Sequence, residues 1–159
     1  MSGAGSPQLA ANAAGLNLTI VASSWHSALI EKLIVGAQQA IRASAGLDAN
    51  ILRVPGAFEL PLGAARAIEL GADAVIAIGV VVRGETPHFE FVAAAATDGL
   101  LRVQLDSGIP VGYGLLTVDD MLQAEARSQD WPAGDNKGAE AALAAISMVR
   151  LGFQHGNNS

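Results

Sequence analysis

Residues 84–88 combine residue types that suit a phosphate site, and they directly follow a long apolar run. Gly84 lets the backbone turn closely around a ligand, Thr86 can cap a helix, and Pro87 suits the first helical position because it has no N–H to leave unpaired. The N-terminus of a helix carries roughly half a positive charge, so its N–H groups attract an anion. The backbone of Glu85 can contribute, whereas its carboxylate would repel phosphate and should point away. The segment therefore predicts a phosphate site.

His88 lies directly beside this predicted site. A lone histidine is more often a surface or packed residue than a catalyst, but this one falls in the first turn of the expected helix. The positive end of the helix disfavours the protonated imidazole, so the ring is ready to accept a proton. We therefore predict that His88 moves protons for a reaction beside the phosphate. Arg83, just before the turn, is predicted to be a structural ion-pair partner.

Other candidates also stand where strands end or helices begin or end. Trp25 follows the first apolar run, where an indole could stack on a flat ring or cover the next helix. Glu59 follows the second run, where its carboxylate could accept hydroxyl hydrogen bonds or complement a helix start. Arg127 ends a helical stretch and could bind either a ligand or the carbonyls there. Lys137 begins the last helix, where a cation is unfavourable, and a phosphate would explain it.

Strand and helix patterns alternate along the chain and would bring these residues together. The stretch 73–82, which is continuously apolar after Asp73 and rich in Val and Ile, is typical of a strand buried on both faces of a parallel sheet. Such α/β sheets bind ligands at the carboxyl ends of their strands. We predict strands at residues 16–22, 51–54, 73–82 and 111–117, and helices at 27–45, 61–71, 87–105, 119–127 and 137–151. Residues 16–151 should form one domain, with flexible segments at 1–15 and 152–159.

Composition limits the classes of function. The 159 residues suffice for one domain, and 51% are hydrophobic, yet none of the segments approaches the ~20 unbroken apolar residues of a membrane span. The beginning of the chain lacks the basic and apolar parts of a secretory signal, and cysteine is absent, so we expect a soluble cytoplasmic protein. A net charge of −6 with nine scattered Lys and Arg argues against a nucleic-acid partner.

Four segments together resemble the lumazine synthase family, whose members catalyse the penultimate step of riboflavin biosynthesis. Besides residues 79–89, they are Ser23-Ser24-Trp25-His26, Pro55-Gly56-Ala57-Phe58-Glu59-Leu60-Pro61 and Asn136-Lys137-Gly138. They occur in the family's order and approximate spacing, and the match covers about residues 16–151. Each fragment is weak alone, but four in register are a strong signal. The resemblance implies a flavodoxin-like, three-layer α/β fold with a four-stranded parallel sheet.

The resemblance also implies roles for the residues near a pyrimidine substrate. It places Trp25 against the pyrimidine ring, and it assigns the ribityl chain to Glu59 with the backbone of Ala57 and Phe58. A carboxylate suits a polyol, because each charge-assisted hydrogen bond contributes roughly 1.5 to 3 kcal/mol. The edge of the pyrimidinedione could pair with the backbone of three core residues, Val80, Val81 and Val82.

On the phosphate side, the resemblance places Arg127 on the substrate phosphate and Lys137 close to it, beside the backbone of residues 84–86. Tyr113 stands at a position that varies in the family and that a neighbouring subunit contributes near the pyrimidine. Its hydroxyl either contacts the ligand or faces solvent. His26 is left with a structural or solvent role, because nothing in its motif assigns it chemistry.

The implied reaction condenses 5-amino-6-(D-ribitylamino)pyrimidine-2,4-dione with 3,4-dihydroxy-2-butanone 4-phosphate, giving 6,7-dimethyl-8-ribityllumazine with loss of phosphate and water. The amine attacks the ketone to form an imine, phosphate leaves by elimination, and the second nitrogen closes the ring. These steps need proton transfer and positioning, and the resemblance implies neither a metal nor an organic cofactor.

The resemblance further implies a homopentamer with active sites between neighbouring chains, and it suggests riboflavin synthase as a protein partner. Capsid-forming relatives join their last two helices by a short turn that contains glycine and lysine and sets the angle between pentamers. Here residues 128–136 form a longer connection that Pro132 stiffens. We expect assembly to stop at the pentamer or a small multiple of it, unless the loop length is incidental.

Three other classes of protein fit the sequence less well than the enzyme. A binding or storage shell for flavin-like ligands would keep Trp25 and Glu59, but it would not need His88 and Arg127 together. A phosphorylated signalling domain of similar fold would need an aspartate after the first strand, where residues 23–26 supply none. Nucleotide-binding folds would show a glycine fingerprint or a P-loop, and neither follows the first strand.

Overall fold

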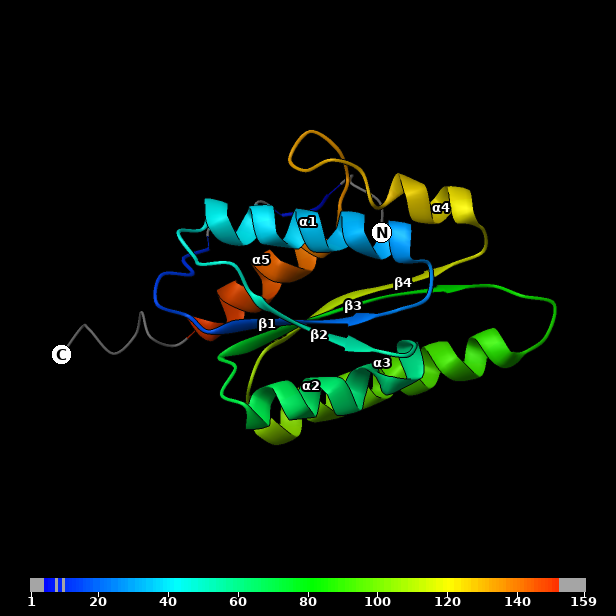
Figure 1. Cartoon of the computed structure of the whole chain (residues 1–159), viewed down its shortest axis with the longest axis horizontal. Coiled ribbons are helices and arrows are strands. Elements are labelled where there is room, and N and C mark those ends of the chain that lie inside the picture. The colour runs from blue at the N-terminus through cyan, green and yellow to red at the C-terminus, as the bar shows by residue number, and fades with distance from the viewer. Residues whose placement is uncertain (1–4, 8, 10, 152–159) are drawn as a thin grey trace.

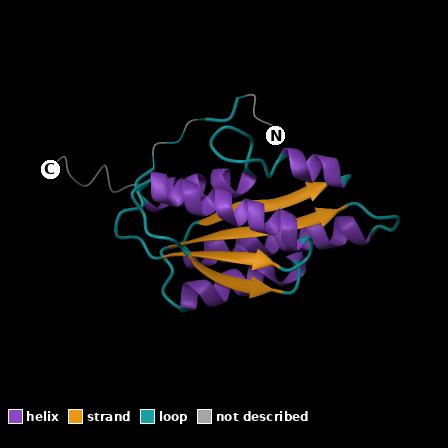
Figure 2. Cartoon of the chain, turned by 45° about the horizontal axis from the view of Figure 1, so that its top comes forward, coloured by secondary structure: helices purple, strands orange, loops and turns teal. Residues whose placement is uncertain are grey.

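Apolar segments of the chain form a sheet of four parallel strands, β1 (Leu18–Ser23), β2 (Asn50–Val54), β3 (Ala74–Val82) and β4 (Val111–Val118). The computed structural model, which describes residues 5–7, 9 and 11–151, places them in the order β2-β1-β3-β4 (Figure 1). All three neighbouring pairs run parallel, so the carboxyl ends of the strands meet at one edge (Figure 2).

Two layers of helices cover the sheet (Figure 1). Helices α1 (Ser27–Ala43) and α5 (Lys137–Val149) pack on one face, and α2 (Leu60–Glu69) and α3 (His88–Ser107) pack on the other. A short helix α4 (Met121–Ala126) follows β4, and the 3-10 turn η1 (Ala57–Glu59) leads into α2. This is the predicted flavodoxin-like α/β architecture.

Alternate residues of each strand supply the two hydrophobic cores, because successive side chains point to opposite faces of a sheet. Ile20 and Ile76 are fully buried in the core beneath α1 and α5. Val21 and Val75 are fully buried in the opposite core beneath α2 and α3. The first core is tight because α5 approaches α1 at Gly138, where any Cβ atom would overlap the α1 backbone.

The predicted boundaries of helix α1 differ slightly from the observed ones, for a local reason. The helix ends at Ala43, two residues before the predicted end at residue 45, and the left-handed residue in the turn that follows is Ala45, with φ of 63°, rather than the nearby Gly46. Gly46 serves a different purpose. A Cβ atom there would lie 2.7 Å from the side chain of Ala13 and 2.8 Å from that of Ile41, so glycine provides space.

Helix α3 begins one residue later than predicted and continues further. It starts at His88, so Pro87 occupies the N-cap, and the prediction that Thr86 is the N-cap was wrong. The Thr86 hydroxyl lies 3.4 Å from the His88 backbone N–H, which is a long hydrogen bond. At the other end, the helix continues two residues past the predicted end at residue 105, to Ser107, and Gly108 terminates it with φ of 70°.

Part of the N-terminal segment packs on the body of the protein. Ala13 is fully buried, and its N–H donates to the Ser44 carbonyl oxygen at 2.7 Å. The Arg150 guanidinium donates to the carbonyl oxygens of Asn12 and Ala14. The prediction of a flexible N-terminal segment did not include this packing. Residues 152–159, for which flexibility was also predicted, lie outside the described residues. Among the described helices, none is long and apolar enough to cross a membrane.

Candidate active site

A pocket with a volume of about 820 Å³ opens at the carboxyl edge of the sheet. Four segments line it, and each follows or ends a strand or belongs to α3, as expected for a ligand site of a parallel sheet. They are Trp25 and His26 after β1, residues 56–59 after β2, residues 80–82 at the end of β3, and the α3 residues His88, Phe91, Val92 and Ala95.

The loops after β1 and β2 are joined, and this junction positions Trp25 and Glu59. The Ser24 hydroxyl donates to the Val54 carbonyl oxygen at 2.8 Å. The Glu59 Oε2 atom accepts a hydrogen bond from the Gly56 N–H at 2.9 Å. A Cβ atom at Gly56 would lie 3.4 Å from the Trp25 ring, so the indole, the glycine and the carboxylate are close neighbours. Glu59 therefore both caps η1 and faces the pocket.

Strand β3 extends beyond its neighbour β1 and offers free backbone groups. Its pairing with β1 ends at Ile78, whereas its pairing with β4 continues to Val82. Among the described strands, none therefore pairs with the edge of residues 79–82 that faces away from β4. Three of these residues, Val80, Val81 and Val82, line the pocket. Backbone N–H and C=O groups there are available to a ligand with complementary donors and acceptors.

His88 lines this pocket, and the predicted phosphate turn directly precedes it in the chain. His88 is the first residue of α3 and lines the pocket. Gly84, Glu85 and Thr86 precede it and are exposed, and they are not part of the pocket lining. Within the described part of the chain, the backbone N–H groups of these three residues donate no hydrogen bond. The turn is thus open to an anion.

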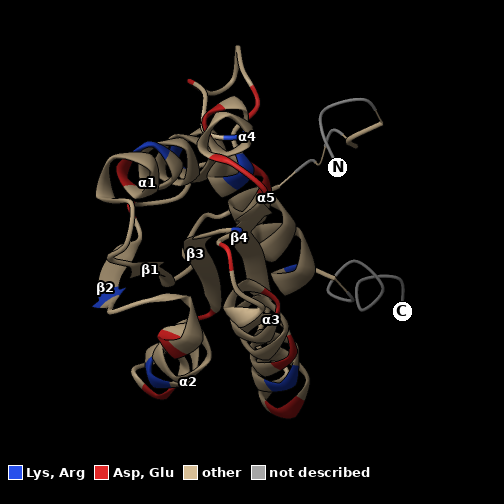
Figure 3. Cartoon of the chain, turned by 90° about the vertical axis from the view of Figure 1, so that its right-hand side faces the viewer, with Lys and Arg blue, Asp and Glu red and all other residues tan. Residues whose placement is uncertain are grey.

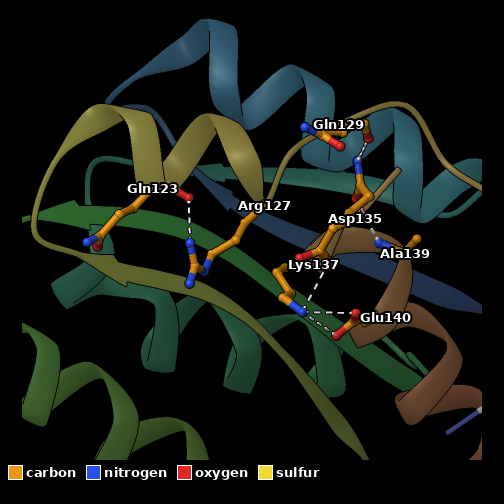
Figure 4. Close-up of polar contacts among 8 residues, drawn as sticks. Gln123, Arg127, Gln129, Asp135, Lys137, Ala139 and Glu140 are labelled. Atoms are coloured by element: carbon orange, nitrogen blue, oxygen red, sulfur yellow. Dashed lines mark hydrogen bonds and ion pairs between the residues drawn. The ribbon is translucent and has the colours of Figure 1, made fainter. Parts of the chain in front are cut away.

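Arg127 and Lys137 lie together at the junction of α4 and α5, and neither lines the pocket (Figure 4). The Arg127 Nη1 atom donates to the Gln123 carbonyl oxygen at 2.9 Å, at the carboxyl end of α4. The Lys137 ammonium, whose side chain is 13% exposed, lies 3.1 Å from the Asp135 carboxylate and 2.9 Å from that of Glu140. Two carboxylates therefore balance the positive charge of Lys137, whereas none of the ion pairs between described residues involves Arg127.

The charge state of Lys137 follows from two opposing effects. Burial lowers the pKa of its ammonium, but the hydrogen bonds and negative charges of Glu140 and Asp135 outweigh that effect and leave the pKa raised. Lys137 therefore stays protonated at neutral pH. Its backbone N–H donates to the Arg127 carbonyl oxygen at 2.9 Å, which fixes the two candidate phosphate residues relative to each other.

Three further residues fall into different surroundings. Tyr113 lies on β4 outside the pocket, 47% exposed, with its hydroxyl 2.7 Å from that of Thr97. His26 lines the pocket and is the N-cap of α1, in the left-handed conformation. The prediction that Arg83 is an ion-pair partner is confirmed, because its side chain pairs with Asp119 and Glu90.

Some pocket residues escaped the sequence analysis. Gly56, Phe91, Val92 and Ala95 line the pocket beside the predicted residues. The spacing of the three α3 residues from His88 is three, four and seven, which is one face of a helix. That periodicity was available as a signal once His88 was assigned to a helix start. Among the described residues, no group of three His, Asp or Glu side chains could hold a metal ion.

Comparison with known sequences identifies the family. The sequence model of the 6,7-dimethyl-8-ribityllumazine synthase family matches residues 15–152. The chain belongs to this family. A protein named 6,7-dimethyl-8-ribityllumazine synthase from Leifsonia xyli subsp. xyli is 52% identical, over 94% of this chain and 95% of its own length. One of the same name from Kineococcus radiotolerans is 48% identical, over 94% of this chain and 92% of its own. The chain is therefore an enzyme, a transferase of riboflavin biosynthesis.

Proposed function

We propose that this enzyme condenses 5-amino-6-(D-ribitylamino)pyrimidine-2,4-dione with 3,4-dihydroxy-2-butanone 4-phosphate to form 6,7-dimethyl-8-ribityllumazine. The observation that carries the proposal is the pocket that joins Trp25, Glu59, the open edge of β3 and His88. An aromatic face, a hydroxyl acceptor, a row of backbone groups and a proton carrier are what a flat heterocycle with a polyol chain needs for this reaction.

The pyrimidine would bind between the loops after β1 and β2. Its ring would stack on Trp25, and its dione edge would pair with the open backbone edge of residues 79–82. The ribityl hydroxyls would donate to Glu59, whose Oε2 atom already accepts one N–H hydrogen bond and can accept more, since a carboxylate offers about four lone-pair sites. This pose directs the reacting amine toward His88.

The phosphate would bind at the exposed turn of residues 84–86, where backbone N–H groups and the start of α3 favour an anion. Arg127 would supply the compensating charge, with Lys137 close to it. Because neither residue lines the pocket of its own chain, we propose that they serve the pocket of a neighbouring copy in a ring of five.

Exposed apolar side chains support such an assembly. Helix α3 has 20 residues, of which only Ala96 and Leu100 are fully buried. Phe91, Leu101 and Leu105 are 74%, 52% and 71% exposed on the same helix. Apolar surface of this kind marks an interface with another protein. A neighbouring chain that covers α3 would also close the pocket around Phe91.

Within the closed site, His88 would transfer protons. It would accept a proton as the amine attacks the ketone and return one as water leaves to form the imine. It would then take a proton from the carbon that allows phosphate to be eliminated. Ring closure by the second nitrogen releases a second water. Holding both substrates face to face supplies much of the acceleration, and proton transfer adds to it.

The test is to mix the purified chain with both substrates and follow the lumazine chromophore by absorbance. We expect absorbance to grow with enzyme concentration, and to stay at the uncatalysed rate when the enzyme or either substrate is omitted. Binding of the pyrimidine without turnover would contradict the proposal and favour a non-catalytic binding protein.

A further inference from the structure

Arg83 is bound to three separate parts of the chain. It directly follows β3, and its backbone N–H donates to the Val118 carbonyl oxygen at 2.8 Å. Its Nε atom donates to Asp119 Oδ1 at 2.8 Å, and its Nη1 atom donates to Glu90 Oε1 at 3.3 Å. Its guanidinium carbon also lies 4.5 Å from the centre of the Phe89 ring.

These contacts close the turn that carries the candidate chemistry. Arg83 precedes residues 84–88, whereas Phe89 and Glu90 follow them. The guanidinium therefore joins the two ends of the turn. Apart from the long hydrogen bond from the His88 N–H to the Thr86 hydroxyl, no polar contact between described residues holds residues 84–86. The carbonyl oxygen of Pro87 accepts from the N–H groups of Glu90 and Phe91 in the first turn of α3. The position of the turn thus depends on its two ends.

The other partner of Arg83 is itself firmly held. Asp119 donates its backbone N–H to Gln123 Oε1 at 2.9 Å, and the neighbouring Asp120 caps α4 by accepting from the Gln123 N–H at 2.9 Å. The hydrogen bond from Arg83 lowers the pKa of the Asp119 carboxyl, so this pair is fully charged at neutral pH. The ion pair between Arg83 and Asp119 therefore connects the turn to the junction between β4 and α4.

We propose that Arg83 is a positioning residue for the reaction, because it holds both ends of the turn that presents the backbone N–H groups to phosphate and His88 to the substrate. The proposal rests on the function proposed above. The ion pairs of Arg83 are exposed and therefore add little to stability. Their removal should instead affect catalysis, since small displacements of a reacting group are costly.

The experiment compares Arg83→Ala and Arg83→Lys with Arg66→Ala as a matched control. Arg66 forms a similar exposed ion pair on α2, with Glu69 at 2.8 Å, and it does not line the pocket. For Arg83→Ala we expect kcat to fall about tenfold and KM for the butanone phosphate to rise about tenfold, with KM for the pyrimidine within about twofold. Arg83→Lys should recover part of this loss, because an ammonium keeps one ion pair but lacks the planar fork.

Several outcomes would overturn the proposal. Kinetic constants of Arg83→Ala equal to those of Arg66→Ala would do so. An equal rise in both KM values would also do so, because it indicates general disorder of the site. If thermal melting shows that Arg83→Ala is unfolded, Asp119→Asn replaces it as the test. This variant weakens the shorter of the two ion pairs of Arg83, and it should also raise KM for the butanone phosphate more than KM for the pyrimidine. A folded Asp119→Asn with unchanged kinetics contradicts the proposal. A wild-type chain that forms no lumazine overturns the proposed function itself.

Discussion

His26 and His88 both line the pocket, but their backbones differ. His26 has a left-handed conformation, with φ of 56°, and no side-chain hydrogen bond caps its helix. Left-handed residues other than glycine cost energy and often occur at functional sites. His88 has ordinary helical surroundings at the start of α3, beside the open turn. Both histidines line the pocket at the start of a helix, and of the two it is His88 that directly follows the candidate anion site.

Replacing His88 by Ala should lower kcat about a hundredfold and change both KM values little, because the imidazole moves protons rather than binding substrate. Steady-state kinetics with each substrate varied in turn measures this. His26→Asn provides the comparison, since asparagine tolerates the left-handed conformation. Full activity of His88→Ala at saturating substrate, or an equal loss in His26→Asn, would show that the proton carrier is misassigned.

Arg127 and Lys137 differ in the charge that they can offer a phosphate. The two carboxylates beside Lys137 cancel its charge, whereas Arg127 contacts only a neutral carbonyl among the hydrogen bonds and ion pairs described. Removal of Arg127 should therefore raise KM for the butanone phosphate at least about tenfold and KM for the pyrimidine much less, because guanidinium binds phosphate through two parallel hydrogen bonds.

The control for Arg127→Ala is Arg66→Ala, which removes an exposed arginine paired with Glu69 on α2. It should match the wild type in both KM values. Equal effects of Arg127→Ala on the two substrates would refute the phosphate assignment. An effect confined to kcat would also refute it, because a binding residue for one substrate must change the affinity for that substrate.

At the scale of elements, Asn136 joins α1, the 128–136 connection and α5. It is 2% exposed, and its amide donates to the carbonyl oxygens of Lys32 and Gln129. Its Oδ1 atom accepts from the Ala139 N–H, which caps α5. A Cβ atom at Gly36 would overlap this amide, so α1 leaves room for it. One side chain thus fixes the start of the helix that carries Lys137.

Asn136→Ala should lower the free energy of unfolding by about 2 to 4 kcal/mol, because it removes a helix cap and the two hydrogen bonds from the buried Asn136 amide to Lys32 and Gln129. Urea denaturation at one fixed protein concentration measures this, since association adds to apparent stability. The control Asn50→Ala removes an exposed amide that donates to Asn17, and it should change stability by less than about 0.5 kcal/mol. Equal midpoints for both variants would contradict the role of Asn136.

The strands and helices were predictable because burial imposes clear patterns on them. The apolar run of β3 needs both faces covered, and its observed bounds lie within one residue of the prediction. Contacts that depend on distant residues left no such pattern. Arg83 meets Asp119, 36 residues away, only because β3 and β4 are neighbours. Ala13 is likewise buried, with its N–H bonded to Ser44 at the end of α1. Nothing in the sequence indicated this contact, because a single small residue in a polar segment shows no periodic pattern.

The candidate site was predictable in part for the same reason. Residues at strand ends, such as Trp25 and Glu59, share one edge of a parallel sheet by topology alone, and the structure brings them into one pocket with His88. Arg127 and Lys137 also follow a strand, but their helices carry them away from that pocket. The sequence motifs therefore did not predict that these two residues lie outside the pocket of their own chain.

For the whole molecule, charge and apolar surface are distributed differently. Lys and Arg alternate with Asp and Glu over the helices seen from the carboxyl edge of the sheet (Figure 3). Exposed apolar side chains include Phe58 and Phe91 at the pocket and Leu105 on α3, which are 64%, 74% and 71% exposed. A scattered charge gives no basic face, whereas large exposed apolar side chains favour association with further copies of the chain.

We predict that the working unit is a ring of five chains that does not close into a shell. The 128–136 connection is fixed at both ends, because Asn136 pairs with Ser128 in an isolated bridge and Trp131 packs against the core. A long connection held in this way should resist the change in angle that shell closure needs, since closed symmetry tolerates little variation between units.

Light scattering in dilute neutral buffer should therefore give a mass near five times 16.1 kDa, or a small multiple of that value. Phe91→Glu on the exposed face of α3 should break the ring, because a buried charge without a partner is costly at an interface. Leu47→Glu, at an 84% exposed position far from α3, is the control and should leave the mass unchanged. Closed shells in negative-stain images would contradict the limit on assembly, and a monomeric wild type would contradict the ring itself.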